Sequence, residues 1–137
     1  YLNKISGPLL DRIDLHIEVN PVPFDDLSKE RNGEKSEVIR NRVINARDRQ
    51  TKRFKDSRVH YNSQMGPKEL DAFCNLDDNS KNLIKIVMEK LNLSARAYDR
   101  IIRVGRTIAD LEGSENILSK HISEAIQYRS LDRNQWM

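Results

Sequence analysis

The strongest helix signal in the sequence runs from Leu91 to Gly113, LNLSARAYDRIIRVGRTIADLEG, and the fold is predicted around this segment. Ser94 is a residue type that caps helix N-termini, and Gly113 suits the left-handed backbone that often ends a helix. Apolar residues recur between them at helical spacing, which predicts one long amphipathic helix. The expected inner stripe is Ala97, Ile101, Val104, Ile108 and Leu111, widened by Tyr98, Ile102 and Ala109.

The same helix carries four arginines within an arc of roughly 120° on one side. They are Arg96, Arg100, Arg103 and Arg106. Asp99 and Asp110 share this arc and can pair with the last two arginines at a spacing of four residues. The positive charges of Arg96 and Arg100 are therefore expected to be little compensated by acidic side chains of the same helix.

Arg96 lies in the first turn, where the positive end of the helix dipole disfavours a cation. A guanidinium and the free N–H groups of that turn together form a good anion site. Two interpretations stay open on spacing alone. Arg96 is either a solvated or ion-paired surface residue, or it contacts a phosphate group.

The composition indicates a charge-rich helical protein with a modest core. Of 137 residues, 37% are hydrophobic and 33% charged, and five glycines with four prolines disfavour a turn-rich β fold. No apolar run reaches the ~18 residues of a membrane span, and the chain opens without a signal-peptide pattern. Cys74 is alone in an apolar context, which predicts a buried structural thiol and fits a reducing cytoplasm.

Positive charge is concentrated in one segment. The net charge is +3, but Lys35 to Arg58 holds nine basic and three acidic residues, a local net of +6. A basic helix of this kind can track a phosphate backbone. It can equally be a solvated outer face, because Phe54 is the single aromatic residue among these charges and no set of stacking residues interleaves with them.

The N-terminal region predicts a strand without a partner. Residues 13–19 alternate apolar and polar without a fault, and no second convincing strand follows. We therefore expect its sheet to lie in sequence upstream, in a larger protein. In isolation, residues 1–20 are expected to be mobile or to pair with another molecule.

The remainder predicts a mainly α fold, a bundle of about five helices. Besides the central helix, the pattern predicts helices over 36–55, 67–74, 79–91 and 120–129. Asp77 or Asp78 caps the third of these, and Ser119 caps the last. The side chains expected to face inward are Ile39, Val43, Ala46 and Gln50; then Leu83, Ile86, Val87 and Leu91; then Ile122, Ala125 and Ile126.

No residue constellation in the chain predicts a self-sufficient catalytic site. His16, His60 and His121 have no companion ligands at metal-binding spacing, so no metal site is expected. A glycine-rich phosphate loop and a GxSxG nucleophile motif are both missing from the sequence. By itself, the chain is not expected to bind and hydrolyse a nucleotide.

Two motifs nevertheless carry a resemblance to a known family. Residues 7–15, GPLLDRIDL, and residues 93–113, LSARAYDRIIRV followed by G and RTIADLEG, resemble the magnesium-chelatase-like AAA+ ATPases of the ComM/YifB family. The segments NSQM at 62–65 and HISEAIQYR at 121–129 add to the resemblance. It covers residues 1 to about 133.

The resemblance implies that the chain is a C-terminal helical lid, separated from its ATPase core. It implies the end of the core in 1–20, a linker in 21–35, the lid in 36–130 and a tail in 131–137. Arg96 would be the sensor-2 arginine and Arg12 the arginine finger acting on a neighbouring subunit, with Arg100 as a possible support. For Arg12, the alternative is a salt bridge to Asp11 or Asp14.

The resemblance also implies cofactors and partners. The full-length protein would use ATP and Mg²⁺, neither of them bound by this chain alone. It would form a homo-oligomeric, hexameric ring in the cytoplasm, off the membrane, and act on DNA in branch migration during natural transformation. Two alternatives stay open: an autonomous basic helical module that binds nucleic acid, and a chelatase-type motor that remodels a protein or inserts a metal.

Overall fold

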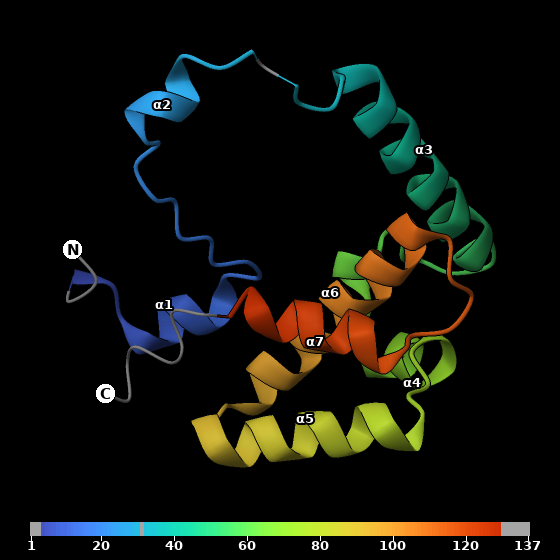
Figure 1. Ribbon diagram of the computed structural model, residues 1–137. Helices are drawn as coiled ribbons and strands as arrows, with labels where there is room; N and C mark the ends of the chain where they lie inside the picture. Colours follow the sequence, from blue (N-terminus) through green and yellow to red (C-terminus); the bar gives the residue numbers. More distant parts are fainter. Residues whose placement is uncertain (1–3, 31, 130–137) are drawn as a thin grey trace.

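The computed structural model describes residues 4–30 and 32–129, and it is mainly helical, as predicted (Figure 1). The predicted tail, residues 131–137, lies outside the described residues. The elements are α1 (Gly7–Arg12), α2 (Phe24–Leu27), α3 (Ser36–Arg53), the 3₁₀ turn η2 (Asn62–Gln64), α4 (Pro67–Phe73), α5 (Asp78–Leu91), α6 (Ala95–Glu112) and α7 (Ser119–Gln127). None of the described helices combines the length and the apolar character needed to cross a membrane.

α6 is the central element of the bundle. It packs against α3, α7, α1 and η2, while α5 packs on α7 (Figure 1). The core is formed by buried apolar side chains of α4 to α7, the loops that adjoin them and the end of α3: Phe54, Met65, Leu70, Cys74, Ile84, Ile101, Ile102, Ala109, Ile117, Ile122 and Ala125. α6 approaches α7 closely at Gly105, where a Cβ atom would lie 2.9 Å from Cδ1 of Ile122.

The ends of α6 and α5 confirm the predicted caps. The Ser94 hydroxyl accepts the N–H of Ala97 at 3.2 Å, and Gly113 ends α6 with a φ of 81°. Asp77 is the cap of α5, since its carboxylate accepts the Ser80 N–H at 2.7 Å. The predicted cap of α7 is wrong: Leu118 is the N-cap, and the ring of His121 accepts its N–H at 2.9 Å.

The buried faces of the helices differ in part from the predicted stripes. In α6, Ile101, Ile102 and Ala109 are buried as predicted, but Gly105 is buried as well, and Tyr98 and Leu111 are exposed. In α5, Ile84 is buried and Ile86 exposed. The reason is that α6 lies between α3 on one side and α7 on another, so its buried surface is wider than one stripe.

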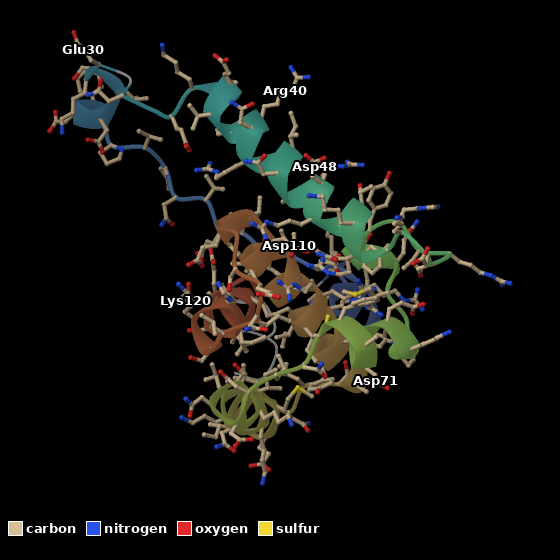
Figure 2. The ribbon with its side chains drawn as sticks, turned by 90° about the vertical axis from the view of Figure 1, so that its right-hand side faces the viewer. Glu30, Arg40, Asp48, Asp71, Asp110 and Lys120 are labelled. Carbon is tan, nitrogen blue, oxygen red and sulfur yellow. The ribbon has the colours of Figure 1, made fainter. Side chains whose placement is uncertain are left out.

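The first half of α3 extends beyond the bundle (Figure 1). Of its predicted inner stripe, Ala46 and Gln50 are buried, while Ile39 and Val43 are each 43% exposed. Figure 2 shows α3 running away from the other helices, with Arg40 on this outer half. The stripe has the predicted spacing, but only its second half reaches α6.

The predicted strand over 13–19 is wrong for the described structure. Only His16 bridges another segment, in a single parallel bridge to Arg129, so no ladder forms. The buried side chain is His16, whereas the apolar Leu15 and Ile17 are exposed. The segment instead contacts Tyr128 and Arg129 of its own chain, so this contact forms without an external partner.

Candidate functional site

Arg96 lies at the N-terminus of α6, in a turn that contains no acidic residue. Its side chain is exposed and, within residues 4–30 and 32–129, it has no hydrogen-bond or ion-pair partner. The first N–H groups of an α-helix also lack partners inside the helix. In α6, Ser94 accepts the N–H groups of Ala97 and Tyr98, which leaves those of Ala95 and Arg96. The local arrangement is therefore a cation beside two available N–H donors, which together suit an anion such as a phosphate.

Arg12 is the last residue of α1, a short helix fixed at its start by a cap. The Ser6 hydroxyl accepts the Leu9 N–H at 3.2 Å, and Leu10 is buried beneath the helix. Arg12 is exposed. Among the described residues it forms no ion pair with Asp11 or Asp14, so the alternative salt bridge is not formed here.

Arg100, one turn after Arg96, instead takes Asp14 as its partner. Its Nη1 atom forms a hydrogen-bonded ion pair with Oδ1 of Asp14, and the two side chains are 25% and 48% exposed. Helix α1 also contacts α6 directly. The fold therefore brings the segment that carries Arg12 alongside the first half of α6, while the charge of Arg100 is already met within the chain.

A buried polar cluster centres on Asp110, and its burial was not predicted from the sequence. Asp110 accepts hydrogen bonds from Arg53 Nη1 and Nη2 at 2.8 and 2.6 Å, and from Asn62 Nδ2 at 2.8 Å. The predicted pair of Arg106 with Asp110 is present at 3.2 Å, but both are buried. Burial lowers the pKa of Arg106, and the Asp110 carboxylate partly offsets that effect. The four-residue spacing gave the only sequence signal for this cluster.

His16, His121 and the cysteine are built into the packing, whereas His60 is exposed. His121 is buried, and its Nε2 atom lies 2.6 Å from Glu112. His16 is buried against Leu10. Cys74 is buried as predicted, and burial raises its pKa to about 11. Among the described residues, no group of three or more His, Cys, Asp or Glu side chains is placed to hold a metal ion.

A cavity of about 550 Å³ lies between residues 14–17, α6 and α7. Its walls include Leu15, Val104, Ile108 and Tyr128, with Asp14 at one edge. Neither Arg12 nor Arg96 lines it. Both predicted site arginines are exposed, so a nucleotide that either of them contacts would lie outside this cavity.

Comparison with known proteins identifies the family. The profile described as "Magnesium chelatase, subunit ChlI C-terminal" matches residues 33–129, and the profile "Magnesium chelatase, subunit ChlI" matches residues 1–27. Competence protein ComM of Haemophilus influenzae is 41% identical over 134 residues, or 97% of this chain and 26% of the relative.

Similar coverage is found in two further bacteria. YifB of Escherichia coli and YifB of Salmonella typhimurium are 40% and 38% identical over the same share of the chain. The chain spans about a quarter of the length of these relatives. With one family profile covering most of its residues, the chain belongs to the magnesium-chelatase-like ComM/YifB family, and residues 33–129 correspond to the C-terminal region of that family.

Proposed function

We propose that this chain is the C-terminal lid of an AAA+ ATPase, with Arg96 as the sensor-2 arginine and Arg12 as the arginine finger. The observation that carries this proposal is a difference among the four arginines of α6. Arg100 pairs with Asp14, Arg103 Nε donates to the Met65 carbonyl oxygen at 2.9 Å, and Arg106 pairs with Asp110. Within the described part of the chain, Arg96 alone among them has no partner.

An unpaired guanidinium at a helix N-terminus suits the chemistry of phosphoryl transfer. Negative charge on the transferred phosphoryl oxygens is best met by rigid planar donors already in position. Arg96 would meet the γ-phosphate of ATP bound to its own chain or to a neighbour. Arg12, exposed at the end of α1, would complete the site of the next subunit in a homo-oligomeric ring, which we propose to be a hexamer.

ATP and Mg²⁺ would be held mainly by the part of the full-length protein outside this chain. We further propose that the ring works in the cytoplasm and acts on DNA, in branch migration during natural transformation. The name of the Haemophilus relative, a competence protein, supports this proposal.

The test uses the full-length protein and a fluorescent ATP analogue. Arg96→Ala should weaken analogue binding and slow ATP turnover. Arg12→Ala should leave binding in place and lower turnover by about 10³-fold, the scale of arginine-finger effects. Arg58→Ala removes an exposed arginine without a described partner and should change neither quantity. Unchanged affinity and turnover for Arg96→Ala would reject the sensor role.

A second function, nucleic-acid binding by the helical bundle itself, is supported by a contact beside α3. The guanidinium carbon of Arg47 lies 4.7 Å from the ring centroid of Tyr61, and both residues are exposed. His60 packs edge-on to the same ring. Tertiary contact thus supplies exposed aromatic neighbours to the basic segment, whose own Phe54 is buried. Aromatic faces beside cations suit single-stranded nucleic acid.

Two measurements separate these functions. Salt-dependent binding of labelled single-stranded DNA by this chain, weakened in Tyr61→Ala and Arg47→Ala, would favour the autonomous module. A lack of binding at low salt would exclude the autonomous nucleic-acid-binding module. Stimulation of the full-length ATPase by branched DNA would favour the DNA motor over a chelatase-type motor that remodels a protein or inserts a metal.

A further inference from the structure

The C-terminal end of α1 is held by side chains from distant parts of the chain. The last carbonyl groups of a helix have no partners inside it. Arg129, which follows α7, donates from Nη1 to the Ile13 carbonyl oxygen at 2.5 Å and from Nη2 to that of Leu10 at 3.4 Å. The ring Nε2 of His16 lies 3.3 Å from the same Leu10 oxygen. Several donors therefore converge on the turn that ends in Arg12.

Backbone atoms add a further hydrogen bond to this contact between residues 10–16 and 128–129, and the contact is buried. The N–H of His16 donates to the Tyr128 carbonyl oxygen at 2.6 Å, within the isolated bridge between His16 and Arg129. Leu10, His16 and Arg129 are only 1%, 4% and 1% exposed. A buried polar contact with this many hydrogen bonds is expected to hold one geometry, because each unmade bond would leave a buried polar group unsatisfied.

A second attachment joins the same segment to α6. Asp14 pairs with Arg100, which lies one turn from Arg96 on that helix. Arg12 stands between the two attachments, exposed and without an intrachain partner among the described residues. The position of Arg12 is thereby set by the end of α7 and by the same helix that carries Arg96.

We infer that Arg129 and the Asp14–Arg100 pair form a latch that fixes the Arg12-bearing turn to the lid. Because of this latch, Arg12 and Arg96 would move together. A movement of the lid that brings Arg96 to the nucleotide would also bring Arg12 to the neighbouring subunit. This inference rests on the proposed roles of Arg12 and Arg96. Arg129 is a positioning residue, since its buried guanidinium acts on turnover only through Arg12.

The test is a double-mutant cycle in the full-length protein. Arg129→Lys keeps the charge but loses the planar fork that serves two carbonyl groups. It should lower the kcat for ATP by about 10- to 100-fold, the scale of a misplaced catalytic group, while KM and analogue affinity stay unchanged. In the Arg12→Ala background, the same substitution should cause no further loss, because both changes act through one group.

Two further variants keep the test decisive. Arg106→Lys removes another buried guanidinium, one that donates to the carbonyl oxygens of Ser114 and Glu115, and any loss it causes should be equal in both backgrounds. Asp14→Asn breaks the partly exposed attachment with little risk to folding. It should lower kcat in the wild-type background only, and it decides the question if Arg129→Lys does not fold.

The outcomes are distinguishable. Wild-type kcat in a folded Arg129→Lys protein, or in Asp14→Asn if Arg129→Lys does not fold, would overturn the latch. An equal fold-loss with and without Arg12 would also overturn it and leave the finger itself intact. Wild-type kcat in the Arg12→Ala single variant would instead overturn the proposed function, and the latch with it.

Discussion

Asp110 in α6 accepts two hydrogen bonds from the guanidinium of Arg53 in α3, at 2.6 and 2.8 Å, across 57 residues of sequence. The Asp110 side chain is fully buried and that of Arg53 is 13% exposed. Figure 2 shows Asp110 among the side chains between α3 and the helices below it. Arg106 approaches the same carboxylate, so one buried anion serves a buried cation and a largely buried one.

Asp110→Asn is expected to lower the free energy of unfolding by about 3 to 5 kcal/mol, because it leaves two guanidinium groups buried without their anion. Urea unfolding followed by circular dichroism measures the change. Asp48→Asn, at an exposed position of α3, is the matched control and should have little effect. A loss below about 1 kcal/mol, the range of exposed ion pairs, would contradict the prediction.

Gly105→Ala tests the close packing of α6 on α7. Alanine favours a helix over glycine by about 1 kcal/mol, but its Cβ would lie 2.9 Å from Cδ1 of the fully buried Ile122. Overpacking a core costs about 1 to 3 kcal/mol, so we expect a net loss of stability. Adding Ile122→Val removes the obstructing methyl group and should recover part of that loss. A Gly105→Ala protein that is more stable than wild type would show that Ile122 moves away freely.

Cys74 predicts a change of stability at alkaline pH. Burial raises the pKa of the folded thiol from the ordinary 9.0 to about 11, so the folded state retains its proton at pH values where the unfolded chain has lost it. The stability that the protonated Cys74 thiol contributes is therefore fully present below pH 9 and is lost as the pH rises toward 11. Cys74→Ala should show a smaller fall in the free energy of unfolding across this range. Identical slopes for the two proteins would disprove the effect.

Glu112 predicts a change at acid pH. Hydrogen bonds from Lys120 and His121 lower the pKa of Glu112 below its ordinary 4.5. The stability gained is therefore present above pH 4.5 and is lost as the pH falls through the folded pKa. Glu112→Gln should reduce the fall in unfolding free energy over this acid range, measured by urea titration at each pH. Glu89→Gln, an exposed residue without a described partner, is the control and should keep the wild-type slope.

The amino-acid sequence alone was sufficient to predict where helices α5 and α6 begin and end. Ser94, Asp77 and Gly113 act through hydrogen bonds or backbone angles within a few residues, so their types and spacing were enough to predict the ends of α5 and α6. The position of Arg96 at the start of α6 was predicted for the same reason. Arg12 came only from the family resemblance, and helix α1, which ends in Arg12, was not predicted.

The tertiary structure decided which of these groups are free and which are paired. Arg106 and Asp110 share an arc with Arg96, but they are buried where Arg53 of α3 and the loop after α6 meet them, whereas Arg96 stays exposed. Residues 13–19 alternate like a strand, yet the buried side chain is His16 because Arg129 and Tyr128 lie beside it. Burial and charge pairing depend on the surface that packs against a residue, and that surface comes from segments far away in the chain.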